Sequence, residues 1–484
     1  MSDSRRGLVD EPGHVFSGEG DHLFLPESTA FFVDLYHIDA AYLAWKGSHT
    51  GTATFDLYTR SNPFAGGFML VAGLEPALDY LQRFSYNDEQ LAYLERVKQY
   101  EPEFLKFLSE MRFTGDIYGI PEGEIAFPNE PILRVTAPFP EAMIVESGLL
   151  RAIGVSTLIA TKAARLALAA GGASIADFAF RRAHAPHIAT RAGYIGGCDS
   201  TSFVAGAMEY DIPPSGTIPH ALVQGYPTEI EAFRAVAASL PAYSLLLDTY
   251  SVERGIENAI TVATEESSRS GHRLTAVRLD SGDLIEDSQM VRRCLDAAGL
   301  HEVRVLVSGD IDEYRIEEIL GAGAPVDGFG VGGNLGVGLG TIDSGTVGGV
   351  IGAVYKLVWF DSDEFHPSRI KLAGGKSTWP GRKQAYRIGN FERDVVQIDR
   401  EPQPVGGRPL LLPIVENGIR VSPEETVQTI RQRALASLDS LPQSLRELTP
   451  SSQYPVEMSE RLLALRQETI ERYQQQVANP AERQ

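Results

Sequence analysis

The sequence is poor in cysteine, in positive charge and in long apolar runs. Its two cysteines, Cys198 and Cys294, fit no metal-binding spacing and no disulfide framework. The formal net charge of −21 argues against the basic surface of a nucleic-acid-binding protein, so no nucleic acid is expected as a partner. Charges interrupt the apolar runs before the roughly 18 residues of a membrane span, so no membrane partner is expected. With a polar stretch over residues 1–14, these features predict a cytoplasmic protein.

The composition is otherwise that of a folded protein with a large core, with 43% hydrophobic and 22% charged residues. A chain of 484 residues exceeds the roughly 100–200 residues of one domain. We expect an α/β protein with an N-terminal α+β domain over residues 1–150 and an irregular βα (TIM-like) barrel with the active site over 151–360. The segment 361–484 is expected to pack back on the N-terminal domain, so that both ends of the chain build the α+β domain.

Hydrophobic periodicity supports this division. A strand over 53–59 is followed by helical patterns over 74–84, 88–98, 101–110 and 141–170, and the last pattern stops at two glycines. From residue 174 onward, apolar β-forming segments alternate with helical patterns every 25–30 residues or so, which is typical of βα units. The strands are predicted at 243–247, 274–279, 303–307 and 326–329, and the helices at 229–240, 252–268, 284–298 and 311–320. A strand over 350–360 and helices over 426–438 and 460–475 complete the prediction.

Chemically useful side chains follow these apolar segments. Six segments end in such groups: 176–180 at Arg181-Arg182, 215–219 at His220, 243–247 at Asp248, 274–277 at Arg278 with Asp280, 303–307 at Ser308-Gly309-Asp310, and 326–329 at Gly330 to Gly333. Because the carboxyl ends of barrel strands converge on one face, we expect these groups to form one site. Taken singly, Asp283 and Asp310 could equally be helix N-caps.

Two glycine-rich stretches suggest phosphate binding. The stretch Gly328–Gly333 satisfies G-x-G-x-x-G, but no helix and no acidic strand end follow, so a backbone phosphate cradle is favoured over a dinucleotide fingerprint. A flexible loop is the alternative. The stretch Gly374–Thr378 imitates the end of a P-loop, yet Ile370 replaces the first glycine and Trp379-Pro380-Gly381 prevents the helix. The basic residues of the segment 366–390 either bind phosphate as point charges or form a solvated face; they are Lys371, Lys376, Arg382, Lys383 and Arg387.

His220 is the candidate nucleophile. A lone histidine is usually structural, but Asp248 ends the next predicted strand and could orient this one. An oriented imidazole acts as a base or as a nucleophile toward phosphorus.

Together these motifs resemble the nicotinate phosphoribosyltransferase family, which is related to the nicotinamide and quinolinate phosphoribosyltransferases. Their order and spacing from about residue 30 to about 390 carry the resemblance, and no single motif does. The motifs are Asp34-Leu35-Tyr36, Asn62-Pro63-Phe64, Asp177 to Ala183, Gly196 to Ser202, Gly216 to His220, Arg278 to Asp283 and Phe329 to Gly332.

The resemblance implies an enzyme that transfers phosphoribosyl from phosphoribosyl pyrophosphate to nicotinate, giving nicotinate mononucleotide and pyrophosphate for NAD salvage. It implies Mg²⁺ as cofactor, ATP as co-substrate, and a homodimer with shared active sites. ATP would phosphorylate His220, with Asp248 as its partner. Phe178 and Tyr36 would sandwich the pyridine ring, Tyr36 reaching in from the other subunit.

The remaining site residues are implied in the same way. Asp280 would bind a ribose hydroxyl and help to stabilise positive charge on the ribose, while Arg278 and Arg181 would contact substrate. The other implied ligands are Gly309 and Asp310 at the ribose, Gly332 and Gly333 at the 5′-phosphate, and Lys356, Lys376 and Lys383 at other phosphates. The metal ligands are not identified.

Two alternatives remain: a nicotinamide phosphoribosyltransferase, and a catalytically silent nucleotide-binding barrel. The nicotinamide enzymes carry an aspartate at the position of Ser202, and a carboxylate there would repel nicotinate. Ser202 therefore favours nicotinate, while His220 with Asp248 favours an enzyme over a silent barrel. The chain departs from the family pattern at Cys198, where an aromatic residue is usual, and at His37, where glutamine is usual.

Overall fold

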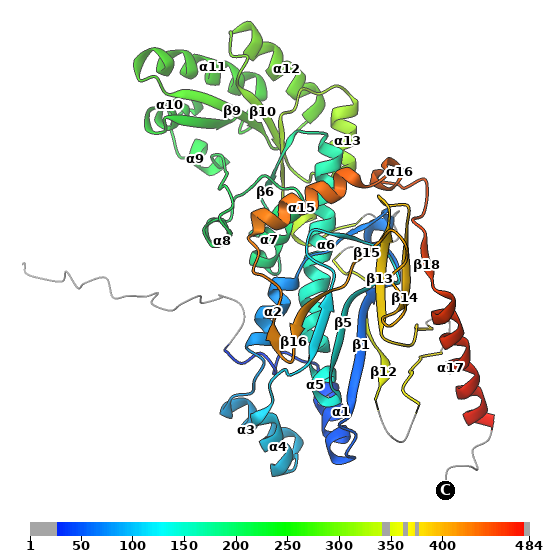
Figure 1. Ribbon diagram of the computed structural model, residues 1–484. Helices are drawn as coiled ribbons and strands as arrows, with labels where there is room; N and C mark the ends of the chain where they lie inside the picture. Colours follow the sequence, from blue (N-terminus) through cyan, green and yellow to red (C-terminus); the bar gives the residue numbers. More distant parts are fainter. Residues whose placement is uncertain (1–26, 341–348, 362–365, 373–376, 479–484) are drawn as a thin grey trace, which may run out of the picture.

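The computed structural model describes residues 27–340, 349–361, 366–372 and 377–478 (Figure 1). Its strands form two six-stranded sheets, a four-stranded sheet and a two-stranded sheet. One large sheet is antiparallel throughout and the other is parallel throughout. The α/β class predicted from the sequence is confirmed.

The antiparallel sheet joins segments from both halves of the chain. In spatial order its strands are β12 (Ala353–Phe360), β1 (Thr52–Thr59), β5 (Pro131–Pro138), β3 (Asp116–Gly119), β16 (Leu412–Glu416) and β17 (Ile419–Arg420). Near it lie α1 (Leu35–Lys46), η1 (Pro63–Ala65), α2 (Leu74–Gln82), α3 (Asp88–Lys98), α4 (Pro102–Glu110) and the pair β2 (Met69–Leu70) and β4 (Ile125–Ala126). The predicted helices over 74–84, 88–98 and 101–110 are confirmed. Asn87 and Gln90 form a capping box that fixes the start of α3.

The helix α6 (Glu146–Ala170), preceded by the short α5 (Phe139–Ile144), connects the two large sheets. Its first half packs into the core of the antiparallel sheet, and its second half into the core of the parallel sheet. It ends at Gly171, which has the positive φ of 59° that a glycine adopts without strain. Contrary to the sequence argument, the stretch Phe139–Ala170 is long and apolar enough to span a membrane. Because 61% of its most apolar 18 residues are buried inside the protein, it is better explained as a core helix.

The parallel sheet has the strand order β7 (Ser200–Thr201), β6 (Ser174–Asp177), β11 (Gly328–Val331), β10 (Arg304–Ser308), β9 (Arg273–Leu279) and β8 (Ala242–Leu246). The helices between these strands are α7 (Pro186–Gly196), α8 (Val204–Tyr210), α9 (His220–Gln224), α10 (Glu229–Ser239), α11 (Val252–Arg269), α12 (Leu284–Ala297), α13 (Glu313–Gly321) and, after β11, α14 (Gly333–Gly336). The four predicted strands and four predicted helices from residue 229 to 329 are confirmed, with ends shifted by a few residues.

Two strand predictions near this sheet are wrong. The segment 215–219 is not a strand, and Pro214 makes only an isolated bridge to Thr201. Prolines 213, 214 and 219 lack the N–H groups that a ladder needs. The segment 176–180 leaves the sheet at Asp177, so Arg181 follows a turn rather than a strand. Within the described ranges no hydrogen-bonded pairing joins β7 to β8, so the parallel sheet is open.

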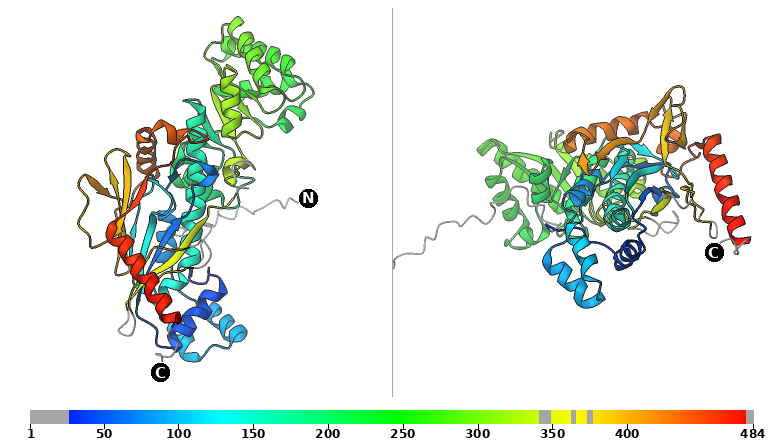
Figure 2. Two further views of the ribbon diagram at one scale, coloured as in Figure 1. Left: turned by 90° about the vertical axis from the view of Figure 1, so that its right-hand side faces the viewer. Right: turned by 60° about the horizontal axis from the view of Figure 1, so that its bottom comes forward.

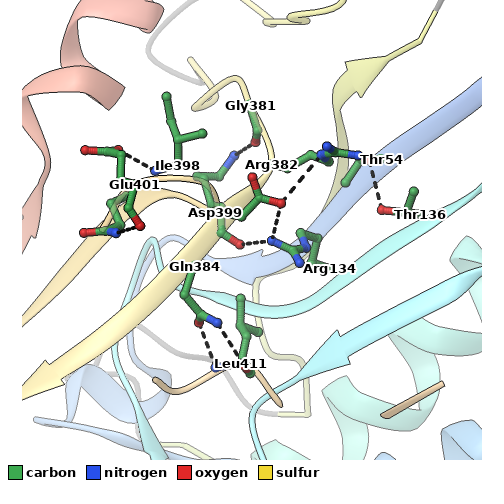
Figure 3. Close-up of polar contacts among 12 residues, drawn as sticks. Thr54, Arg134, Thr136, Gly381, Arg382, Gln384, Ile398, Asp399, Glu401 and Leu411 are labelled. Carbon is green, nitrogen blue, oxygen red and sulfur yellow. Dashed lines mark hydrogen bonds and ion pairs between the residues drawn. The ribbon is translucent and has the colours of Figure 1, made fainter. Parts of the chain in front are cut away.

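The C-terminal part contacts both large sheets. It contains β13 (Lys383–Ile388), β14 (Arg393–Ile398), β15 (Gly407–Pro409), α15 (Val427–Ser440), α16 (Gln443–Arg446), β18 (Val456–Met458) and α17 (Glu460–Ala478). Figure 3 shows Arg134 of β5 and Arg382 both pointing toward Asp399, with nitrogen–oxygen distances of 3.3 and 3.6 Å. Arg431 of α15 donates to backbone carbonyls at the end of α7, including that of Tyr194. The strand predicted over 350–360 and the helices predicted over 426–438 and 460–475 are confirmed.

A buried ion triad joins α6 to the parallel sheet's outer helix α13. Glu313 pairs with Lys162, and its Oε1 accepts a hydrogen bond of 2.9 Å from Arg165 Nε. At most 2% of each of these side chains is exposed. Burial opposes ionisation of Glu313, but the attraction of the two cations outweighs it and holds its pKa below the usual value.

We expect Glu313→Ala to lower the free energy of unfolding by about 3–5 kcal/mol, because it leaves two buried cations without a counter-charge. Denaturant unfolding measures this loss. The matched control is Glu318→Ala on the same helix, whose pair with Arg315 is more exposed and should contribute less than about 1 kcal/mol. Equal losses for the two variants would contradict the prediction.

Candidate active site

The carboxyl ends of β8 and β9 are joined by Asp248. Its Oδ2 accepts hydrogen bonds from the backbone N–H of Asp280, at 3.0 Å, and from the Ser281 hydroxyl, at 2.6 Å. Its Oδ1 is buried and has no hydrogen-bond partner among the residues that the structure describes. One oxygen of Asp248 therefore organises the next loop, and the other remains available to a ligand.

Asp280 occupies the centre of the group. Its Oδ1 accepts a hydrogen bond from Ser308 at the end of β10 and lies 3.5 Å from Arg278 Nη2. Gly309 follows with a φ of 95°, and a Cβ atom there would lie only 2.1 Å from the Asp280 carbonyl oxygen. Only glycine allows β10 to end this close to the end of β9.

His220 faces the same carboxylate from the start of α9. Its Nε2 lies 3.8 Å from Asp280 Oδ2, and its Nδ1 lies 3.1 Å from Thr249 Oγ1. The hydrogen-bond partner of the imidazole is thus Thr249 and not Asp248, whose hydrogen bonds go to the β9 loop. The side chain is 37% exposed, so a ligand can reach it.

Phe178 and Arg278 form an aromatic and cationic pocket beside Asp280. The Phe178 ring packs on Gly330, where a Cβ atom would lie 2.4 Å from a ring carbon. The Arg278 guanidinium lies 6.0 Å from the centre of this ring and donates to Thr217 Oγ1 at 2.5 Å. Burial lowers the pKa of Arg278, but Asp280 opposes this shift. The Nε of Arg278 is buried and has no hydrogen-bond partner in the described part of the chain.

Asp177 fixes the other side of the pocket from the end of β6. Its Oδ2 accepts from the hydroxyls of Thr190, at 2.7 Å, and Thr201, at 2.9 Å. Its Oδ1 accepts from the N–H of Ala179, and its carbonyl from the N–H of Ser202. The Ser202 residue is exposed. One buried aspartate therefore sets the Phe178 turn, α7 and the position of Ser202 together.

The glycine loop after β11 carries basic and acidic residues beside it. A Cβ atom on Gly333 would lie 3.2 Å from Arg182 Cδ, so a basic side chain covers the loop. Arg181 is exposed and close enough to Arg278 to lower its pKa. Asp310 is exposed and has a φ of 48°, which is rare for a non-glycine residue.

The alternative that Asp283 and Asp310 are helix N-caps holds for Asp283 only. Asp283 is the N-cap of α12 and accepts from the N–H groups of Ile285 and Glu286, both at 3.1 Å. Asp310 is not a cap, because Asp312 caps α13.

The structure does not bring Tyr36 and Lys356 to this group. Tyr36 lies on α1 and Lys356 on β12. Figure 1 shows α1 at the bottom of the molecule and α9, β9 and β10 in its upper part, and the left view of Figure 2, turned about the vertical axis, shows the same order. Lys356 is close enough to His37 to affect its pKa, so the two predicted site residues share a second neighbourhood.

Lys383 belongs to neither group. It is 3% exposed, and its amine lies 2.7 Å from Asp56 Oδ2 and donates to the carbonyls of Trp379 and Gly381. The amine is enclosed by this ion pair and these two carbonyls inside the protein, so a phosphate in solvent cannot reach it. Lys376 lies outside the described residues.

Sequence reasoning named Ser308 at a strand end and included Asp177 and Thr217 in motifs. It did not predict that these three residues and Thr249 are the hydrogen-bond partners that orient the site residues. Ser308 and Asp177 each end a strand, which was an available signal. Thr217 and Thr249 lie in irregular segments that no periodicity marks.

Two family profiles match the chain. Residues 31–154 match the nicotinate phosphoribosyltransferase N-terminal domain, and residues 399–466 match the C-terminal domain of the same enzyme. Nicotinate phosphoribosyltransferase pncB2 of Mycobacterium tuberculosis is 39% identical over 442 residues, which cover 90% of this chain and 92% of that protein. Nicotinate phosphoribosyltransferase of Bacillus subtilis is 36% identical over 470 residues, which cover 90% of this chain and 94% of that protein.

A solved structure of the same kind of enzyme has a similar fold. The crystal structure of human nicotinic acid phosphoribosyltransferase superposes with a TM-score of 0.79 at 29% identity, covering 90% of this chain and 99% of that one. The C-terminal match extends beyond residue 390, where the resemblance seen in the sequence ended. The chain belongs to the nicotinate phosphoribosyltransferase family.

Proposed function

We propose that this protein converts nicotinate and phosphoribosyl pyrophosphate into nicotinate mononucleotide and pyrophosphate, a step of NAD salvage. The observation that carries the proposal is the joint presence of Phe178, Arg278, Asp280 and His220 at neighbouring strand ends, in a chain of this family. Phe178 and Arg278 suit a planar anion, Asp280 suits a ribose, and His220 suits a phosphate donor.

The pyridine ring packs on the Phe178 face, and its carboxylate is attracted by Arg278 and Arg181. The unpartnered Nε of Arg278 offers this anion a hydrogen bond. Ser202 adds no charge that would repel it, which favours nicotinate over nicotinamide. The ring stack holds the attacking nitrogen in line with the ribose carbon.

The ribose lies at Asp280, with Gly309 and Asp310 beside it and the Gly332–Gly333 loop at its 5′-phosphate. The ribose carbon gains positive charge as pyrophosphate leaves, and the carboxylate of Asp280 stabilises that charge. Arg278 and Ser308 hold Asp280 in place before the reaction begins.

His220 is proposed as the group that ATP phosphorylates, so that ATP hydrolysis drives turnover. Thr249 contacts Nδ1 and leaves Nε2 on the side of Asp280. The exposed fraction of the imidazole leaves room for a phosphate donor. This role requires a nucleophile, which a silent nucleotide-binding barrel would not need.

Mg²⁺ fits the site as an ion held mainly by substrate phosphates. Within the described residues no cluster of three or more histidine, cysteine or acidic side chains could hold a metal. Asp248 is the best protein ligand, because its Oδ1 is buried without a partner. Bound there, Mg²⁺ would neutralise charge on the departing pyrophosphate.

We further propose a cytoplasmic homodimer in which the partner subunit's Tyr36 and the partner's Lys356 complete the site. The separation of these residues from the strand ends of their own chain supports this arrangement. The proposed domains are 1–150, 151–360 and 361–484, with the parallel sheet as part of an irregular barrel. Pairing of β16 with β3 supports the return of the segment 361–484 to the first domain, and β12, at the end of the second range, already pairs with β1.

We expect His220→Ala to remove the ATP-dependent part of nicotinate mononucleotide formation, by more than about 100-fold, because no nucleophile remains to accept the phosphate. Product formed per ATP hydrolysed measures this effect.

Thr249→Val is the graded test of the same role. It removes one neutral hydrogen bond to Nδ1 and should weaken ATP coupling only roughly three- to tenfold. His272→Ala is the matched control, since that imidazole contacts the Ala237 carbonyl away from the strand ends. Full ATP coupling in His220→Ala would refute the phosphohistidine role.

We expect Ser202→Asp to lower kcat/KM for nicotinate at least tenfold or so relative to nicotinamide, because a carboxylate repels the substrate carboxylate and accepts from an amide. Ser202→Ala removes the hydroxyl without adding charge and should change this ratio little. Steady-state assays with both pyridines decide the matter. A wild-type enzyme that prefers nicotinamide would contradict the assignment of Ser202.

A further inference from the structure

The exposed ring of Tyr36 rests on a buried histidine. The centres of the Tyr36 and His37 rings lie 4.0 Å apart, with an angle of 39° between their planes. Tyr36 is 61% exposed and His37 only 5%. Neighbouring residues on a helix do not normally face each other, so this contact at the start of α1 is a specific feature. His37 forms the support of an aromatic ring that otherwise projects into solvent.

The imidazole of His37 has an unused polar atom. Its Nε2 is buried and makes no hydrogen bond to any of the described residues. Glu146 Oε2 lies 3.9 Å from this nitrogen, which is too long for a hydrogen bond but within reach of a small movement. Burial lowers the pKa of His37, so the ring is neutral near pH 7. The unprotonated nitrogen of a neutral imidazole can accept a hydrogen bond from the O–H of a neighbouring protonated carboxyl group.

The Glu146 carboxyl lies among charged and titratable groups from two other elements. These groups are Asp34, Tyr36 and His37 at the start of α1, and Tyr355 and Lys356 on β12. Burial raises the pKa of Glu146 to about 7; Lys356 opposes the shift and Asp34 adds to it. Asp34 itself is held by Ser147, which donates to its carboxylate at 2.7 Å. The neighbourhood of the Tyr36 ring therefore changes charge near neutral pH.

We propose that His37 and Glu146 are positioning residues for Tyr36, and that the protonation state of Glu146 controls how tightly the site binds the nicotinate anion. The inference rests on the proposed function, in which Tyr36 stacks on the pyridine ring. Protonated Glu146 donates to Nε2 of His37 and holds the support of the Tyr36 ring. Ionised Glu146 cannot donate, turns toward Lys356, and adds a negative charge close to the bound carboxylate.

The test is the KM for nicotinate between pH 6 and 8.5, measured with kcat on the full-length protein. In the wild type we expect KM to rise roughly fivefold with pH, the effect of one added charge at moderate distance, while kcat does not follow. Glu146→Gln keeps the shape of the side chain without titrating, so its KM should stay flat. His37→Ala removes the support of the ring and should raise KM roughly fivefold at pH 6, with kcat unchanged.

Glu141→Gln is the matched control, because Glu141 is also a carboxyl whose pKa is raised by burial but its hydrogen bonds go to Thr114. It should keep the wild-type KM profile. His37→Gln shows whether a neutral hydrogen-bonding side chain restores the KM lost in His37→Ala, and thermal melting confirms that each variant is folded.

The inference is overturned if Glu146→Gln keeps the wild-type slope of KM against pH, or if His37→Ala changes kcat in proportion to its folded fraction without changing KM. Failure of the wild type to form nicotinate mononucleotide would instead refute the proposed function. The two failures are therefore distinguishable.

Discussion

The arrangement of the strand-end site depends on the carboxylate of Asp280. It is shared by Arg278 from its own strand and Ser308 from β10, and it faces His220 from α9. Its backbone N–H is held by Asp248 beyond β8. Four separate chain segments thus meet at one residue, and each interaction is electrostatic in a partly enclosed place where charge interactions are stronger than in water. The positions of the Arg278 guanidinium, the His220 imidazole and the Asp280 carboxylate are consequently not independent.

Asp177 imposes a similar constraint on the other side of the pocket. It is buried, and its two oxygens accept hydrogen bonds from β7, α7 and the Phe178 turn. Because Phe178 packs on the backbone of Gly330, the turn is also tied to β11. The Phe178 ring and the Asp280 carboxylate are therefore both fixed to strands of one sheet. A parallel sheet supplies this rigidity because its carboxyl ends lie on the same edge.

The sequence predicted most of the scaffold because its signals are local. Apolar periodicity located the βα units, and the position of Asp283 before a helical pattern allowed a cap. What it could not predict is the choice of partner across the fold. His220 contacts Thr249 rather than Asp248, and Lys383 is held by Asp56, because these pairings depend on how distant segments pack. A two-residue strand such as β7 also has no periodic signal.

The polar atoms that the fold leaves unpaired explain how the site favours an anionic substrate in a chain of net charge −21. Within the described ranges, Arg278 Nε and Asp248 Oδ1 are buried without hydrogen-bond partners, and such a buried polar atom costs about 1–3 kcal/mol. A substrate carboxylate at the first atom and a phosphate-bound cation at the second would recover that cost on binding. Because Asp280 and Thr217 already fix the rest of the Arg278 guanidinium, little reorganisation opposes the gain. The unpaired atoms thus lower the stability of the free protein, and binding of a carboxylate together with a phosphate-bound cation would recover that free energy, which would make the site selective for such ligands.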